Sequence, residues 1–534
     1  MTLVTRRRLA ATLAGALTAT LAAAGSVAVT VRAGPALAAT TPGVGAGYWQ
    51  TRGDQILDSN GNPVRIAGIN WYGFETPDEI AHGLWSQDYH TIINDIAALG
   101  YNTIRIPFSN QMVEDPIVPQ NLSFSSSTGQ PINADLKGLT ALQDLQKIVT
   151  AAGQAGLKVI LDDHRSEAGE SAEQDGLWYT STYTSQDWVN DWVTLAKMFA
   201  GNPTVIGFDL RNEPHTPAGD TYAEGATWGT GDPSTDVRLA YEQAGNAILA
   251  VDPGALIFCE GISEFPDASA SGGYDTTWWG GDLQGVAQYP VVLSSPGHVV
   301  YSAHDYGPSL FQQAWFTSTT TPASLDAVWN KYWGYIYAQG TAPVWVGEFG
   351  TDNTASDIES SAAGSQGQWF QSLVSYLSAN QWMGWTYWAL NGEDSYDLLD
   401  NNYDPTPVSS LKQSLLAGIQ FPLPGAGNGT PPPSSPPPAS LSCAYSVTNS
   451  WSGGFQAQVV ISNTGSGATT SWSIGWTFPG GQTLASDWSG VFTQTGANVT
   501  VTNEPYNASI APGSSVTVGF TASGTAPSTL SVSC

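Results

Sequence analysis

Apolar, β-branched runs alternate with longer segments of helical periodicity over residues 43–422. Segments such as 136–156, 185–202 and 324–340 have apolar positions spaced three and four apart and stop at Gly or Asn. Strands that are apolar almost throughout belong to parallel sheets covered on both faces. The strand runs are VRIAGIN (64–70), TIRIPF (103–108), KVILDDH (158–164), VIGFDLRNE (205–213), LIFCEGIS (256–263), HVVYSAHDY (298–306), PVWVGEFG (343–350) and GWTYWAL (384–390). Eight strand and helix repeats predict an α/β fold, a (β/α)8 TIM barrel.

The C-terminal part of the chain has a different pattern. Residues 425–440, GAGNGTPPPSSPPPAS, are typical of an extended, semi-rigid linker. Residues 441–534 contain short alternating runs rich in Thr, Val and Ser, such as FQAQVVIS and NVTVTN, broken by Gly, Asn and Pro. This pattern predicts an all-β sandwich.

The first 38 residues are typical of an export signal. Three arginines at 6–8 precede an Ala- and Leu-rich run from Leu9 to about Val31, and Ala-Leu-Ala at 36–38 fits the pattern cut by signal peptidase. A membrane anchor is the alternative, but the run is rich in Ala, Gly and Thr rather than Leu, Ile and Phe. We therefore expect a secreted, extracellular protein. The arginines fit both ordinary and twin-arginine export.

The formal net charge of −29 argues against polyanionic partners, because binding nucleic acid or an anionic membrane requires basic clusters. Neutral or cationic substrates remain. Residues 441–534 hold no Lys, Arg or His, and their only acids are Asp487 and Glu504. Binding by this domain must therefore rest on aromatic and hydrogen-bonding contacts.

Two of the three cysteines, Cys443 and Cys534, bracket the last domain. In an exported protein this placement predicts a disulfide closing a loop of roughly 90 residues, worth on the order of 4 kcal/mol. Cys259, in the apolar string LIFCEG, is predicted to be buried, with a reactive thiol as the alternative.

Polar residues gather late in the predicted barrel strands, where such barrels carry their chemistry. They are Arg105, His164, Asn212, Glu213, His304, Tyr306 and Glu348. Glycoside cleavage needs one carboxylic acid to protonate the leaving oxygen and one carboxylate to attack or to activate water, and Glu213 with Glu348 satisfies that need.

Other interpretations of these residues remain. Glu260 also lies in a strand run, so spacing alone does not distinguish it from Glu348, and Arg105 in an apolar strand is also compatible with a structural ion pair. A metal site at Asp162, Asp163 and His164 lacks a second cluster such as HxH to complete it, so we expect neither metal nor cofactor.

The strings IAGINWYGFET, YNTIRIPFS, GNPTVIGFDLRNEPH, HVVYSAHDY and VWVGEFG, with the strand around Trp388, resemble glycoside hydrolase family 5. Among its members the likeness is to secreted actinobacterial endo-β-1,4-glucanases, over about residues 45–422. The tail from Cys443 to Cys534 resembles the family 2 cellulose-binding modules.

The resemblance implies a role for each residue. Glu213 would be the general acid/base and Glu348 the nucleophile, which a nearby Arg105 would keep ionised. The supporting roles are a hydrogen bond from Tyr306 to the nucleophile, a contact of Asn212 with the sugar 2-hydroxyl, shaping of the site by His164 and His304, and stacking by Trp388. Trp71, Trp85 and His82 would line more distant sugar subsites, with packing as the alternative for each.

In the tail, the matching row of stacking aromatics is Trp451, Trp488 and Tyr506. Tyrosine stands at the third position, where binders of crystalline cellulose commonly have tryptophan, so we expect less stacking area. Trp472 and Trp476 lie four apart on one strand face and are predicted to be core residues.

The resulting expectation is an endo-β-1,4-glucanase that hydrolyses cellulose with net retention and is held to the polymer by its C-terminal module. Its expected partners are cellulose and soluble β-1,4-glucans, with no nucleic acid and no membrane after signal removal, and we expect a monomer. The alternatives are the same machinery acting on mannan or another β-glycan, and a non-catalytic polysaccharide-binding protein.

Overall fold

The computed structural model describes residues 43–270, 272–422, 441–464, 469, 471–504, 507–508, 510 and 514–534. The predicted export signal (1–38), the predicted linker (425–440) and Tyr506 lie outside these residues.

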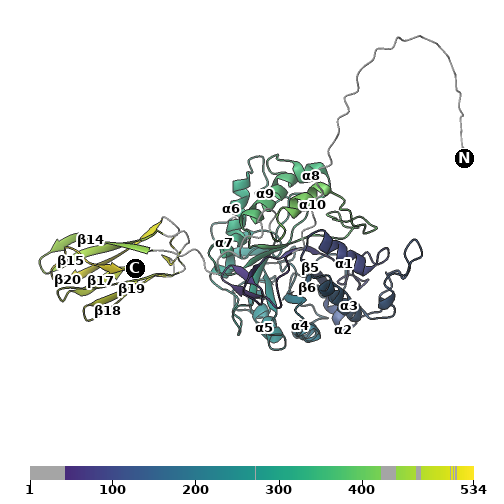
Figure 1. The fold of residues 1–534 in the computed structure, drawn as a ribbon, viewed down its shortest axis with the longest axis horizontal. Coiled ribbons are helices and arrows are strands. Elements are labelled where there is room, and N and C mark those ends of the chain that lie inside the picture. The colour runs from purple at the N-terminus through teal and green to yellow at the C-terminus, as the bar shows by residue number, and fades with distance from the viewer. Residues whose placement is uncertain are drawn as a thin grey trace, which may run out of the picture. The chain divides into compact units, whose positions relative to one another are not determined.

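Eight parallel strands close into a barrel, as predicted (Figure 1). Strands consecutive among the eight are neighbours in space, and β13 pairs with β4 to complete the ring. The strands are β4 (Ala67–Asn70), β5 (Thr103–Ser109), β6 (Lys158–Arg165), β7 (Val205–Asp209), β8 (Leu256–Glu260), β11 (Val299–His304), β12 (Val344–Glu348) and β13 (Gly384–Tyr387).

The α-helices begin at a polar N-cap residue, except α7, whose N-cap is Gly334. Thr184, for example, accepts a hydrogen bond from the backbone N–H of Asp187, whose carboxylate accepts from the N–H of Thr184 in return. The helices are α1 (Tyr89–Ala98), α2 (Asn110–Glu114), α3 (Ala141–Gln154), α4 (Ser185–Phe199), α5 (Val237–Leu249), α6 (Pro322–Trp329), α7 (Tyr335–Ala338), α8 (Ala355–Glu359), α9 (Gln366–Ala379) and α10 (Ser410–Ala417). A π-helical stretch, Asn330–Gly334, joins α6 to α7 within the predicted helix 324–340.

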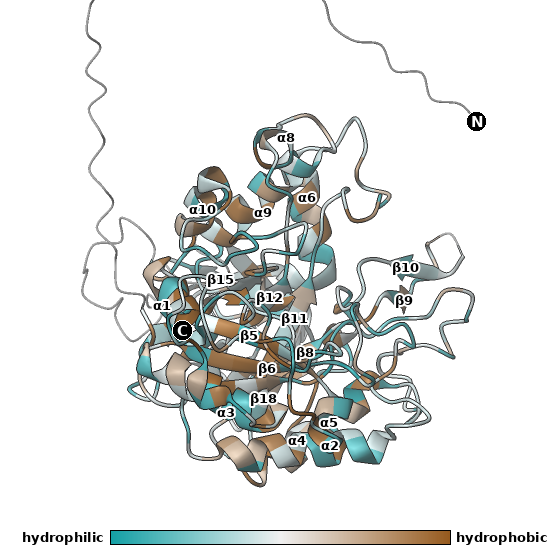
Figure 2. Cartoon of the chain, turned by 90° about the vertical axis from the view of Figure 1, so that its right-hand side faces the viewer, coloured by the Kyte–Doolittle hydropathy of each residue, from teal (hydrophilic) through white to brown (hydrophobic). Residues whose placement is uncertain are grey.

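The barrel strands are buried between an inner core and the surrounding helices. Figure 2 shows β5 and β6 in the colour of hydrophobic residues and helices striped between hydrophobic and hydrophilic faces. The inner core joins strand residues such as Ile160, Phe258 and Trp345 to Trp49 and Ile56 of the N-terminal segment. That segment forms a small sheet of β1 (Gln50–Arg52), β2 (Gln55–Leu57) and β3 (Pro63–Val64), and a second hairpin, β9 (Glu264–Pro266) with β10 (Tyr274–Thr276), follows β8.

The C-terminal domain contains two four-stranded antiparallel sheets. One has the order β14-β15-β20-β17, and the other β18-β19-β16-β21. Their bounds are β14 (Leu441–Trp451), β15 (Gly454–Asn463), β16 (Ser473–Thr477), β17 (Thr483–Trp488), β18 (Val491–Thr495), β19 (Asn498–Thr502), β20 (Ser515–Ser523) and β21 (Val532–Ser533). Trp472 and Trp476 are buried in the core, as predicted, and the predicted disulfide joins Cys443 to Cys534.

Candidate active site

Two glutamates meet at the carboxyl end of the barrel. Glu348 is the last residue of β12, and Glu213 follows β7 in the chain. An oxygen of Glu213, a ring nitrogen of His304 and an oxygen of Glu348 all lie within 4.8 Å of one another. Retaining glycosidases hold their carboxyl groups about 5–5.5 Å apart and inverting ones about 6.5–9.5 Å, so this spacing fits the retaining arrangement.

Glu348 is surrounded by groups that favour its ionised form. Arg105 Nη1 donates to its Oε1 at 2.6 Å, and the Tyr306 hydroxyl donates to its Oε2 at 2.8 Å. Burial raises the pKa of Glu348, but the charges of His304 and Arg105 outweigh that effect and leave the pKa below its ordinary value. Glu348 is therefore a carboxylate that can attack.

Glu213 has the opposite tendency. Burial raises its pKa, and the nearby carboxylates of Glu348 and Glu260 add to the rise, while a contact of 3.1 Å between its Oε1 and His304 Nδ1 partly opposes it. The side chain is 15% exposed, against 5% for Glu348, so solvent or substrate can reach it. Two carboxyl groups with opposed pKa shifts are suited to act as acid and nucleophile.

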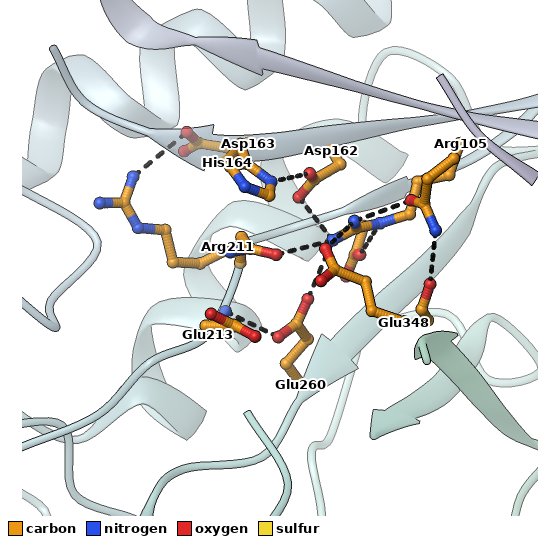
Figure 3. A network of polar contacts seen from close by, with 12 residues as sticks. Arg105, Asp162, Asp163, His164, Arg211, Glu213, Glu260 and Glu348 are labelled. Atoms are coloured by element: carbon orange, nitrogen blue, oxygen red, sulfur yellow. Dashed lines mark hydrogen bonds and ion pairs between the residues drawn. The ribbon is translucent and has the colours of Figure 1, made fainter. Parts of the chain in front are cut away.

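Arg105 lies fully buried at the centre of an acidic cluster (Figure 3). Besides Glu348, its guanidinium pairs with Asp162 at 3.0 Å, Asp209 at 2.9 Å and Glu260 at 3.3 Å. These last three acids are close enough together to hold a cation, and the guanidinium already supplies a positive charge to each. Arg105 thus forms structural ion pairs and also bonds Glu348 directly.

The three residues of the alternative metal site do not converge on one point. Asp162 Oδ2 lies 2.7 Å from His164 Nδ1, whereas Asp163, on the opposite face of β6, pairs with Arg211 at 3.2 Å (Figure 3). His164 instead stacks on Trp388 with ring centroids 5.5 Å apart.

Asn212 is oriented by the same guanidinium. Its Oδ1 accepts from Arg105 Nη2 at 3.0 Å, and its buried Nδ2 has no hydrogen-bond partner among the described residues. The amide therefore keeps a donor for a ligand beside the two glutamates.

Two cavities adjoin this cluster. A polar one of ≈ 140 Å³ includes His82, His164 and Trp388 in its wall, together with the acids Glu75, Glu170, Glu393 and Asp394. A more apolar one of ≈ 470 Å³ is lined by Glu213, Tyr306, Trp278, Trp279, Leu310 and Phe311, among others. Sequence reasoning missed Trp278 and Trp279, because 21 tryptophans give no pattern that separates walls from core.

The prediction that Trp71 lines a sugar subsite is wrong. Its side chain is fully buried, and its indole N–H donates to the backbone oxygen of His82 at 2.9 Å. Trp71 is a core residue that supports His82. Trp85 is partly exposed and packs edge-on against His82 at 5.2 Å, so its place at a distant subsite stays a prediction.

In the C-terminal domain, Trp451 is 50% exposed and Trp488 42% exposed. Both belong to the sheet that contains β15 and β20, and each ring lies against a glycine of the neighbouring strand, Gly454 or Gly519. These glycines alternate with core residues such as Phe455 and Phe520, so both tryptophans lie on the outer face of the sheet.

Two families match the chain. Residues 57–394 match Cellulase (glycosyl hydrolase family 5), and residues 441–534 match the Cellulose binding domain. Within the described part of the chain, no helix combines the length and apolar character needed to cross a membrane.

Named relatives agree with these matches. An endoglucanase of Paenibacillus polymyxa is 43% identical over 380 residues, covering 71% of this chain and 88% of that protein. The major extracellular endoglucanase of Xanthomonas campestris pv. campestris is 32% identical over 488 residues, covering 88% of this chain and 93% of that protein. A solved structure of an endocellulase from the archaeon Pyrococcus horikoshii has a TM-score of 0.62 and 34% identity, covering 70% of this chain and 99% of that chain.

Proposed function

The chain belongs to glycosyl hydrolase family 5, the cellulase family, and from this premise we propose that Glu213 and Glu348 carry out its reaction. The protein is an endo-β-1,4-glucanase with a cellulose-binding domain at its C-terminal end. The observation that carries the proposal is the close approach of two carboxyl groups whose pKa values are shifted in opposite directions.

The reaction proceeds in two steps with net retention. Glu213 protonates the glycosidic oxygen as Glu348 attacks the anomeric carbon, which forms a covalent glycosyl-enzyme and releases the leaving chain. Glu213, now ionised, takes a proton from water, and the resulting attack on the anomeric carbon frees Glu348.

Neighbouring residues prepare each step. Arg105 and Tyr306 keep Glu348 ionised and oriented through their hydrogen bonds to its two oxygens. The free donor of Asn212 faces the sugar 2-hydroxyl, where a hydrogen bond strengthens in the transition state. The polar cavity with His82, His164 and Trp388 takes the sugar that becomes covalently bound, and the apolar cavity bounded by Glu213 takes the leaving chain.

The C-terminal domain attaches the enzyme to cellulose through its exposed aromatic rings. Trp451 and Trp488 stack on sugar faces, and Tyr506 completes the row in this proposal. We also propose that residues 1–38 direct export and that the mature enzyme acts outside the cell as a monomer. The extracellular nature of the Xanthomonas relative supports the site of action.

Replacing the two glutamates tests the mechanism. Glu348→Ala should abolish hydrolysis, and added azide should restore turnover of an activated aryl cellobioside with an inverted glycosyl azide as product. Glu213→Gln should lower kcat/KM on cellotetraose by roughly 10²–10⁴-fold, because the sugar leaving group needs a proton, and should spare the activated aryl substrate. An active Glu348→Ala protein, or equal losses on both substrates for Glu213→Gln, would refute the assignment.

A further inference from the structure

Glu260 is a buried carboxylate beside Glu213 that the mechanism above does not use. It is the last residue of β8 and is 0% exposed. Its Oε2 accepts a hydrogen bond from the backbone N–H of Glu213 at 2.7 Å (Figure 3). Its Oε1 lies 3.2 Å from His304 Nε2 and 3.3 Å from Arg105 Nη2. Both oxygens are therefore engaged, and neither is exposed to a substrate.

The backbone that Glu260 holds is in an unfavourable conformation. Glu213 has φ of +50°, in the left-handed region that residues with a Cβ rarely adopt. Such conformations persist where the surroundings impose them, and they concentrate at active sites. A charged acceptor on the Glu213 N–H stabilises this backbone, which aims the acid/base side chain.

Gly280 makes room for this contact. A Cβ at Gly280 would lie 2.5 Å from Oε2 of Glu260 and 3.4 Å from the Cα of Glu213. Any side chain at that position would push the carboxylate off the Glu213 N–H. The Glu260 carboxylate therefore occupies the space that a side chain at position 280 would take.

The same carboxylate lies beside His304. Its Oε1 is at ion-pair distance, 3.2 Å, from Nε2, which makes no hydrogen bond among the described residues, so the attraction between the two is electrostatic. This attraction holds the Nε2 edge of the ring toward Glu260, and Nδ1 then faces the catalytic pair. Nδ1 lies 3.1 Å from Oε1 of Glu213 and 3.6 Å from Oε2 of Glu348. Glu260 thus acts on Glu213 twice, through its backbone and through the imidazole beside its carboxyl group.

We propose that Glu260 is a positioning residue for general acid–base catalysis, holding the backbone of Glu213 and the ring of His304 in place. The inference rests on the proposed role of Glu213. It assigns to Glu260 no contact with the sugar and no share in the covalent step.

Glu260→Gln and Glu260→Asp separate the hydrogen bond to the Glu213 backbone from the negative charge beside His304. Glutamine keeps an oxygen for the Glu213 N–H but removes the charge that orients His304, whereas aspartate keeps the charge and draws the carboxylate back from Glu213. Each variant should lower kcat/KM on cellotetraose by roughly ten- to a hundredfold, a part of what acid–base catalysis supplies. Each should keep kcat/KM on 2,4-dinitrophenyl cellobioside within about threefold, because that leaving group needs no proton.

Azide provides a readout that a merely structural role would not change. Water needs a base to attack the glycosyl-enzyme and azide does not, so azide should raise kcat of both variants on the aryl substrate and give a glycosyl azide of retained configuration. The control is Asp305→Asn, which alters another buried carboxylate, bonded to Trp369 Nε1 at 2.6 Å, and should leave the ratio of the two substrates unchanged.

Equal losses on both substrates with no azide effect would overturn the inference. Gly280→Ala provides the same comparison if both Glu260 variants fail to fold, since its Cβ displaces the carboxylate without removing it; the backbone strain of alanine at φ +68° adds a cost in stability but no dependence on the leaving group. Glu213→Gln, measured alongside, keeps the two proposals distinct. If that variant lacks leaving-group dependence the proposed mechanism fails, and if it shows the dependence while the Glu260 variants do not, only the role of Glu260 fails.

Discussion

Glu213 and Glu348 differ in their neighbours, and in our proposal those neighbours determine which is acid and which is nucleophile. Glu348 receives hydrogen bonds from Arg105 and Tyr306, and Glu213 has no cationic side chain as close as Arg105 is to Glu348 among the described residues. In a buried site, contacts of this kind shift pKa values more than solvent-exposed ones do. The assignment of roles is therefore open to test by removing single hydrogen bonds.

Tyr306→Phe removes the hydroxyl that donates to Glu348 Oε2 at 2.8 Å. The bond favours the ionised form of Glu348, the proposed nucleophile, and lowers its pKa, so loss of the bond should raise that pKa. We expect the acidic limb of kcat/KM on a soluble cellooligosaccharide to move up by about one pH unit. Tyr396→Phe is the matched control, because the Tyr396 hydroxyl bonds Ser309 instead of Glu348. An acidic limb that stays in place in Tyr306→Phe would contradict the role of this hydrogen bond.

Sequence reasoning located the polar residues of the site because a charge late in an apolar strand is costly unless it is used. It was unable to assign their partners. That Arg105 belongs to the site can be predicted from its position late in an apolar strand. Its hydrogen bond to Asp209 cannot, because that bond depends on the direction in which the guanidinium points. Trp71 comes directly after β4, a position that predicts a residue at the rim of the barrel. Its indole is instead buried in the core and donates to the backbone oxygen of His82.

At the scale of elements, strands buried on both faces were predictable and short hairpins were not. Six of the eight barrel strands fall within predicted runs, and β5 and β6 extend one residue beyond theirs, because burial on both faces demands continuous apolar sequence. The hairpin β9–β10 has three residues in each strand, too few to show a period of two. The break of helix 324–340 into α6 and α7 was likewise missed, since its apolar spacing continues through the π-helical stretch.

The outer sheet face of the C-terminal domain depends on glycine at two positions. A Cβ at Gly519 would meet the Trp488 ring at 2.2 Å, so Gly519→Val should lift that ring off the sheet. Stacking needs a ring held flat against the sugar face, and each stacked sugar contributes through aromatic contact. We expect weaker adsorption to insoluble cellulose and unchanged activity on carboxymethylcellulose.

Two further variants serve as controls for the adsorption of Gly519→Val. A chain that lacks residues 425–534 gives the lower limit of adsorption, and Gly475→Val, on β16 of the other sheet, tests whether valine in the domain is harmful by itself. Adsorption of Gly519→Val equal to that of the unaltered chain would show that Trp488 does not need the flat arrangement. Loss of carboxymethylcellulose activity on truncation would show that the domain is needed for the catalytic fold.

At the scale of the whole molecule, the protein has a formal net charge of −29, and some of its acidic side chains are buried inside the fold. Burial raises the pKa of Asp144, Asp191, Asp282 and Asp305, each to about 7. Unfolded aspartate has a pKa of about 3.9, so each group binds its proton more tightly in the folded state. Their contribution to stability is complete below about pH 4 and is lost as the pH rises through about 7.

The enzyme should therefore be more stable at pH 5.5 than at pH 8, and Asp144→Asn should isolate one cause. Both carboxylate oxygens of Asp144 are buried without a hydrogen-bond partner among the described residues, so ionisation there is uncompensated. Asparagine cannot ionise, and calorimetry should show that this variant gains more in Tm at pH 8 than at pH 5.5. Groups with lowered pKa, such as Glu348 and Glu393, act in the opposite sense and set the limit at low pH. A Tm that rises from pH 5.5 to 8, or an equal change at both pH values in Asp144→Asn, would contradict this account.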